Sequence, residues 1–332
     1  MSGYTAATRI RWTEWLPWIA ALAFFFLMPE YLSLGARILI FILFALSLDL
    51  ILGYAGIVTL GHSAFFGLGA YTAGIVSAKL GVQDNFLQLV AAAGAAAALG
   101  AATGAIILRT RALTLLMLTL AITAILLEIA NKWSSVTGGA DGLSGVTVAP
   151  ILGLFKFDIF NRTAFLYGLG VLFVAWWVVR RIIYSPFGAV LTGIRENRAR
   201  MHAVGAPVYG RMVLIYAISA TIAGIAGALL TQVNQFVGLN VLGLEPSGDI
   251  LVMLILGGVG RLYGAFVGPV IYLIAQDWLA KQYPEYWYFG VGALLIAVVL
   301  FAPGGILGLA DQVRDKCLRL FKPRSSAKAS AR

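Results

Sequence analysis

Apolar residues fill ten long segments of the chain, and short polar or basic stretches separate them. Most of these segments approach the roughly 20 residues that a helix needs to cross the hydrocarbon core of a bilayer. The pattern therefore predicts an all-α, polytopic integral membrane protein of about ten transmembrane helices. The segments cover approximately residues 15–32, 34–52, 63–80, 86–108, 112–130, 163–181, 212–231, 247–260, 262–280 and 286–302.

Glycine interrupts the apolar pattern most strongly in residues 53–71, GYAGIVTLGHSAFFGLGAY. The surrounding stretch, residues 50–78, contains no Asp, Glu, Lys or Arg. Irregular backbone is tolerated at membrane depth only where it is buried in protein or lines a cavity. The sequence thus predicts a glycine-rich broken helix beside a polar path through the membrane.

The composition excludes a soluble globule. Hydrophobic residues make up 61% of the chain and charged residues only 11%, whereas soluble domains carry about 25% charged residues. The net charge of +10 is spread between apolar runs, which favours membrane orientation over binding to nucleic acid. The single cysteine, Cys317, rules out an intrachain disulfide.

The basic residues also predict an orientation. If the N-terminus is cytoplasmic and each segment crosses once, 18 of the 24 Lys and Arg residues face the cytoplasm, as the positive-inside rule expects. We then expect a cytoplasmic N-terminus (1–14), a transmembrane domain (15–310) and a basic cytoplasmic tail (311–332). The outside retains Arg37, Lys79, Lys132, Lys156, Arg162 and Lys281.

The eighth segment is short, so residues 247–280 have a second interpretation. They form either two spans or a re-entrant hairpin from outside. We favour two spans, because the hairpin leaves Arg261 near the membrane interior at a cost of a few kcal/mol.

A long cytoplasmic loop, residues 182–211, contains helix-breaking residues at both ends of a short predicted helix, 189–204. Pro186 and Gly188 break the preceding helix, and Gly205 stops the new one together with a proline two residues later.

Within this short helix, Glu196 and Arg200 have the i, i+4 spacing of a favourable ion pair. Ile194, Met201 and Val204 form a potential apolar edge. The loop is therefore either a docking element for a soluble partner or a solvated charged loop.

Small residues recur every four positions in the seventh segment, at Ala220, Gly224 and Ala228. This spacing lets helices approach closely in lipid. We expect tight helix packing there.

Chemistry for catalysis or ATP binding is absent from the sequence. It contains no GxxxxGK[ST] phosphate-binding loop and no HExxH metal motif. Asp49, Glu128 and Asp277 are the acids in or near the bilayer; they favour structural roles but leave an ion-coupled secondary transporter open as an alternative. We predict no cofactor and no metal bound by this chain.

Three motifs, in order within residues 34–310, give the chain a family resemblance. They are GYAGIVTLGHSAFFGLGAYTAG (53–74), SPFGAVLTGIRENRARMHAVG (185–205) and SGDILVMLILGGVGRLYGAFVGP (247–269). Together they resemble the inner-membrane permease subunit of ABC importers for branched-chain amino acids, specifically the larger of the two permeases. Permeases for urea, short amides and some aromatic acids look similar.

This resemblance implies a non-enzymatic, multi-pass subunit of a bacterial inner membrane that works by alternating access. Its partners would be a second homologous permease, two ATPase subunits that hold ATP and Mg, and a periplasmic solute-binding protein. The small-molecule substrate would pass through the permeases.

The resemblance also implies roles for individual residues. The translocation path or gate would include Gly53, Gly56, Thr59, Gly61, His62, Phe65, Gly67, Gly69 and Tyr71. Coupling to the ATPase would use Pro186, Gly188, Ile194, Arg195, Glu196, Asn197, Arg200 and Gly205. Gly257, Gly258 and Gly260 would support packing or gating.

Overall fold

A computed structural model describes residues 12–110, 112–150, 161–301 and 304–309. Among these residues the regular elements are all helices, with one isolated β-bridge between Leu143 and Val237. The predicted all-α class is confirmed. The basic tail with Cys317, Lys156 and most of the predicted N-terminal segment lie outside the described residues.

Each of the ten predicted apolar segments contains a helix. These helices are α2 (Leu16–Leu27), α3 (Leu32–Asp49), α4 (Ser63–Ala78), α5 (Asn85–Ile107), α6 (Ala112–Lys132), α8 (Arg162–Ile183), α11 (Val208–Asn234), α12 (Leu244–Gly257), α13 (Gly264–Gln282) and α14 (Trp287–Phe301). The short elements are η1 (Trp12–Trp15), η2 (Pro29–Tyr31), η3 (Leu50–Tyr54), α7 (Ser134–Thr137), η4 (Gly139–Asp141), α9 (Pro186–Glu196), α10 (Arg198–Ala203) and η5 (Leu239–Leu242).

Five helical stretches among the described residues are long and apolar enough to cross a membrane. They are Pro29–Tyr54, Asn85–Ile107, Leu113–Lys132, Arg162–Ile183 and Val208–Asn234. The chain is therefore a multi-pass membrane protein. The count of ten spans stays a prediction, because several of the remaining apolar helices are shorter.

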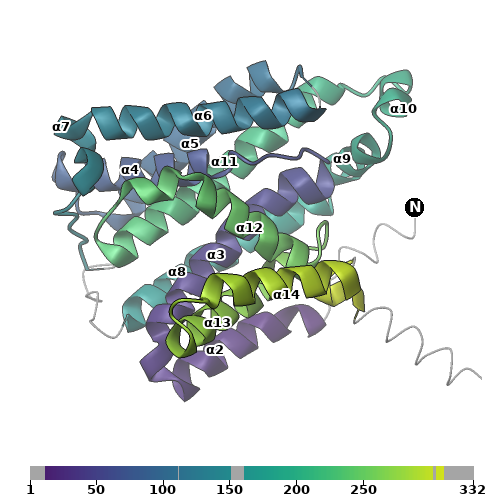
Figure 1. The fold of residues 1–332 in the computed structure, drawn as a ribbon. Coiled ribbons are helices and arrows are strands. Elements are labelled where there is room, and N and C mark those ends of the chain that lie inside the picture. The colour runs from purple at the N-terminus through teal and green to yellow at the C-terminus, as the bar shows by residue number, and fades with distance from the viewer. Residues whose placement is uncertain (1–11, 111, 151–160, 302–303, 310–332) are drawn as a thin grey trace, which may run out of the picture.

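The helices form two groups with α3 and α12 between them (Figure 1). Helices α4, α5, α6 and α11 lie on one side, and α2, α8, α13 and α14 lie on the other. Helix α3 lies at the core of the bundle: in the continuous helical stretch Pro29–Tyr54 that contains it, 89% of the most apolar 18 residues are buried.

Small residues bring α11 close to its neighbours, as the sequence predicts. A Cβ atom on Gly69 of α4 would overlap the backbone of Gly224 in α11, and Gly224 itself leaves no room for a Cβ beside Ala96 of α5. These close approaches increase van der Waals contact between helices, which drives helix association in lipid.

The ends of the helices gather into two opposite faces of the bundle. At one face, Glu14 before α2 forms a buried ion pair with Arg180 near the end of α8, at 2.7 Å, close to α9. At the other face, the bridge between Leu143 and Val237 joins the segment after α7 to the segment after α11, and the Ser77 hydroxyl donates to the Thr147 carbonyl at 2.7 Å. These contacts join segments far apart in the sequence at each end of the bundle, and the predicted orientation stays a prediction.

Candidate functional site

The glycine-rich segment forms a break between α3 and α4. Helix α3 continues into the π-helical turn η3, and α4 begins only at Ser63 after a non-helical stretch. Gly56 within this stretch has φ +68°, a left-handed conformation that favours glycine. Burial then alternates, because Gly56 and Val58 are exposed whereas Ile57 and Thr59 are buried.

The break lies at the level of the helix midpoints. A Cβ on Gly61 would overlap the carbonyl of Thr119, close to the centre of α6. The hydroxyl of Ser219, near the centre of α11, donates to the carbonyl of Ser47 at 2.6 Å, and Ser47 bonds His62. At this depth Gly61 and His62 are buried in protein, as the absence of water in the bilayer core requires for irregular backbone.

Two helices begin at this level. The backbone N–H of Ser63, the first residue of α4, donates to Oγ of Ser247 in the first turn of α12 at 2.8 Å. The Ser63 hydroxyl donates to the Gly243 carbonyl, also at 2.8 Å. With 14 residues, α12 is about 21 Å long, shorter than the roughly 30 Å hydrocarbon core. Both helices thus present their N-terminal ends to the same region.

His62 packs in the core at this break. Its Nε2 hydrogen-bonds Oγ of Ser47 at 2.8 Å, and its ring stacks on Phe44 with centroids 5.5 Å apart. Phe65 meets His62 edge-on and also packs on Tyr216. His62 is only 1% exposed, so in this conformation it stabilises the bundle and does not face an open path.

Apart from Gly56, which is exposed, the other predicted path residues are also enclosed. Thr59 accepts a hydrogen bond from the Gly61 N–H at 3.2 Å, and Gly67 leaves no room for a Cβ beside the Leu242 side chain. Tyr71 is buried, and its hydroxyl has no hydrogen-bond partner within the described part of the chain. These residues fix the packing of α4 in the conformation shown.

The three family-like motifs meet at one point, which we call the glycine junction: Asp49, Gly53, Arg195 and Gly260. The Arg195 guanidinium donates to the Gly53 carbonyl, and the Gly260 N–H donates to Oδ1 of Asp49 at 2.7 Å. A Cβ on Gly53 would lie 2.6 Å from the Gly260 nitrogen, and a Cβ on Gly260 would lie 2.8 Å from Arg195 Nη1. At the junction η3 and the α12–α13 turn are therefore in close backbone contact, and the Arg195 side chain connects them to α9.

The α12–α13 turn depends on glycine conformations. Gly258 has φ +114° and Gly260 has φ +75°, which residues with a Cβ rarely adopt. A Cβ on Gly257 would overlap the Gly264 carbonyl. Because this turn touches Arg195, the α12–α13 pair reaches the end of the bundle that carries α9. The choice between two spans and a re-entrant hairpin stays a prediction.

The loop helix predicted over residues 189–204 is wrong in one respect. Asn197 is extended, with φ −157° and ψ 98°, and divides the segment into α9 and α10. Its side chain accepts from the Arg200 N–H at 2.9 Å and so caps α10. The break prevents the predicted i, i+4 pair: the described structure contains no ion pair between Glu196 and Arg200.

Helix α9 is anchored to the bundle, whereas α10 projects from it (Figure 1). Ser185 caps α9 by accepting from the Gly188 N–H at 3.3 Å, and Pro186 occupies the first helical position. Ile194 is fully buried, but Val204 at the end of α10 is 77% exposed.

The predicted apolar edge is only partly buried, because Met201 packs beside Gly193 and Val204 faces outward. Gly205, with φ +84°, ends α10 as predicted. Glu196 at the end of α9, Arg200 within α10 and Val204 are all exposed.

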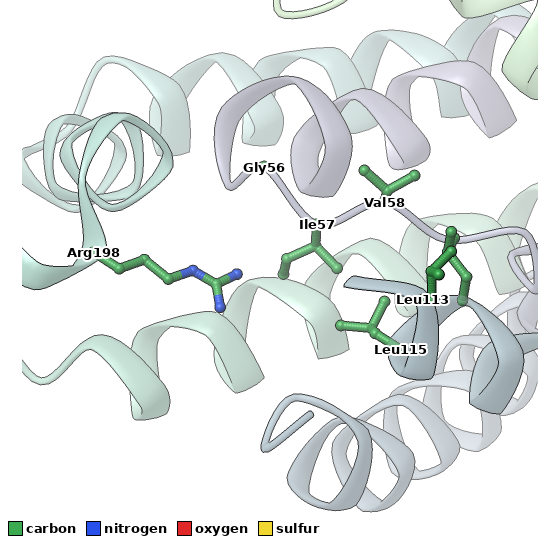
Figure 2. A pocket seen from close by; sticks show the side chains of 7 residues that line it. Gly56, Ile57, Val58, Leu113, Leu115 and Arg198 are labelled. Atoms are coloured by element: carbon green, nitrogen blue, oxygen red, sulfur yellow. The ribbon is translucent and has the colours of Figure 1, made fainter. Parts of the chain in front are cut away.

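A cavity of about 520 Å³ lies beside the break, between its extended segment and the start of α6 (Figure 2). Arg198, at the start of α10, extends toward it (Figure 2). This places the loop motif and the first glycine motif around one cavity. The wall comprises Gly56, Ile57, Val58, Leu113, Leu115, Leu116 and Arg198.

Two of the acids considered as coupling groups form exposed helical pairs. Glu128 pairs with Lys132 at 3.3 Å, and Asp277 pairs with Lys281 at 2.7 Å. The described residues also include no cluster of three or more His, Cys, Asp or Glu that could hold a metal ion.

The chain is therefore a many-helix membrane bundle whose irregular core segment contacts α9, the helix beside the projecting α10. Comparison with known protein families places this bundle among membrane permeases. Residues 31–299 match the family described as the permease component of the branched-chain amino acid transport system, and the chain belongs to this family.

Curated relatives agree with this assignment. One relative is the high-affinity branched-chain amino acid transport system permease protein LivM of Escherichia coli K12, which is 26% identical over 291 residues. The aligned region covers 81% of this chain and 68% of the relative. A probable LivM of Methanocaldococcus jannaschii is 24% identical, covering 79% of this chain and 89% of the relative. Escherichia coli K12 LivH is 32% identical over 133 residues, 38% of this chain and 41% of the relative. No solved structure matches the chain.

Proposed function

We propose that this chain is the larger, LivM-like permease of an ATP-driven importer for branched-chain amino acids. Its α9–α10 face is cytoplasmic, and both termini lie on that side. The concentration of basic residues on this face supports the orientation. The chain itself binds no cofactor; ATP and Mg are held by partner subunits.

The observation that carries the proposal is the contact of Arg195 with Gly53. Arg195 belongs to α9, beside the projecting α10, and its guanidinium reaches the backbone of the broken helix. A rigid-body displacement of α9 therefore acts on η3 and, through Gly260, on the α12–α13 turn. ATPase closure against α9 and α10 thus rearranges the helices around the break.

The partners are a second permease, two ATPases and a periplasmic binding protein. The similarity of this chain to proteins named LivM and LivH supports the paired permease. The exposed Val204 and the charged residues of α10 support a docking surface for a soluble protein. Since the sequence has no phosphate-binding loop, the free energy for uphill transport comes from another chain.

Co-purification from native membranes tests the assembly. We expect two ATPase chains and a second permease to accompany this chain in detergent. Charge reversal at both Arg195 and Glu196 should separate ATP hydrolysis from labelled leucine uptake in proteoliposomes without unfolding the bundle. Wild-type coupling in that double variant contradicts the assigned role of α9.

Transport of labelled leucine and labelled urea by the assembled complex tests the substrate class. We expect uptake of leucine, with the matched binding protein present, and none of urea. Uptake of urea alone assigns the complex to the related class of amide permeases.

A further inference from the structure

A second cavity, of about 630 Å³, opens at the end of the bundle opposite α9. Helices α3, α4, α11, α12 and α13 surround it, and its volume lies in the roughly 300–1,000 Å³ range of small-molecule sites. Its inner wall is apolar and buried, formed by Ile40, Phe41, Phe66 and Val241.

Arg37 brings a positive charge into this cavity from α3. The residue lies about one and a half turns inside a mostly apolar and mostly buried helix, yet it is exposed and lines the cavity. Its guanidinium carbon lies 5.7 Å from the Phe41 ring centroid. Arg37 makes no hydrogen bond or ion pair with any residue in the described ranges.

Asp249 brings a negative charge to the same cavity from α12. Its Oδ1 accepts a hydrogen bond from the Tyr272 hydroxyl at 2.7 Å, which fixes the carboxylate. Arg37 acts on Asp249 electrostatically, but the two are not paired at contact distance. The cavity thus presents Arg37 and Asp249 above an apolar wall. Glu30, Glu245, Asp277 and Lys281 also line it; Asp277 and Lys281 pair with each other at 2.7 Å, and Glu245 accepts from the Tyr288 hydroxyl at 2.9 Å.

We propose, on the basis of the proposed function, that this cavity binds one zwitterionic α-amino acid during transport. Arg37 receives the carboxylate, because guanidinium matches a carboxylate bidentately. Asp249 receives the ammonium group. The side chain of the amino acid lies against Phe41 and Phe66, where a branched hydrocarbon loses contact with water.

The charge arrangement selects a zwitterion over a neutral amide. Ionisable groups inside a membrane are costly and mark pathways for the groups they bind. Urea uses neither full charge, and an anion alone leaves Asp249 without a cationic partner. An α-amino acid satisfies both residues and the apolar wall at once.

Uptake of labelled leucine by the complete reconstituted complex, with its binding protein, tests the site. We expect Arg37→Gln and Asp249→Asn each to lower uptake about tenfold or more, because each removes a charge-assisted hydrogen bond. Arg37→Lys should restore part of the uptake, since it keeps the charge but loses the planar fork. ATP hydrolysis stimulated by leucine-loaded binding protein should stay at the wild-type rate.

Lys79→Gln is the matched control. It removes one positive charge from the same face of the bundle at an exposed residue that does not line the cavity, and uptake should be unchanged.

Three results overturn the site. The first is wild-type uptake by Arg37→Gln, and the second is an equal loss of uptake in Lys79→Gln. The third is that Arg37→Gln loses stimulation of ATP hydrolysis by the binding protein together with uptake, which assigns Arg37 to docking.

If the wild-type complex takes up no leucine, the proposed function fails. The site is then judged by equilibrium binding of labelled leucine to the complex without binding protein. Binding that Arg37→Gln abolishes supports the site, and absence of binding overturns it.

Discussion

Gly53→Ala perturbs the glycine junction by a single methyl group. The new Cβ would overlap Oδ1 of Asp49 and lie 2.6 Å from the Gly260 nitrogen and 2.7 Å from its Cα, whereas ordinary contacts begin near 3.4 Å. Relief of the overlap with Gly260 alone requires about 0.8 Å of separation between η3 and the α12–α13 turn. The same movement stretches the hydrogen bond from Gly260 to Asp49 from 2.7 Å toward the limit of hydrogen bonding.

The loss of that charge-assisted bond costs about 1.5–3 kcal/mol. We therefore expect Gly53→Ala to lower leucine uptake by the complex about tenfold or more and to decrease the unfolding temperature. Gly94→Ala is the control, because a Cβ on Gly94 in α5 would have no atom within 4 Å, and Ala favours helix by about 0.5–1 kcal/mol. Uptake and stability equal to wild type in Gly53→Ala would refute the tight junction.

Individual contacts give three further predictions. Gly67→Leu should block uptake because the new leucine side chain displaces Leu242. Gly170→Leu should transport normally because Gly170 has open space around it, and uptake assays on assembled complexes compare the two variants. Glu14→Gln should destabilise the bundle by about 3–5 kcal/mol because it removes the carboxylate that pairs with the buried Arg180. Glu128→Gln in an exposed pair should cost at most about 0.5 kcal/mol, and thermal unfolding in detergent compares the two variants. Asn197→Ala should weaken α10 by about 1 kcal/mol and reduce the coupling of ATP hydrolysis to transport. Asn197→Asp should retain the helix cap and the coupling, and the ratio of ATP hydrolysed to leucine transported compares the two variants.

The helix positions follow from hydrophobicity, because membrane helices bury their backbone polar groups within continuous apolar segments. The break near residues 53–62 also follows from local sequence, since closely spaced glycines in an uncharged segment favour irregular backbone that is buried in protein. The stop of α10 at Gly205 is a similarly local signal.

Contacts between distant segments could not be obtained in this way. Arg195 and Gly53 are 142 positions apart, and neither residue type specifies the other as its partner. The division at Asn197 depends on a side-chain cap that competes with a continuous helix, and the composition of residues 189–204 suits both. From the sequence alone, Arg37 is an ordinary basic residue near a helix end. Only the fold shows that it lines a cavity together with Asp249.

The central claim is that this permease provides the route through the membrane while a partner provides the energy through α9 and α10. Labelled leucine uptake should be measured in two kinds of proteoliposome. One contains this chain alone under a proton or sodium gradient. The other contains the full complex, with ATP supplied on the side of the membrane to which the ATPase subunits face. We predict uphill uptake by the complex only with ATP, and none by the isolated chain. Uphill uptake by the isolated chain under an ion gradient, abolished by Asp49→Asn, would contradict the account.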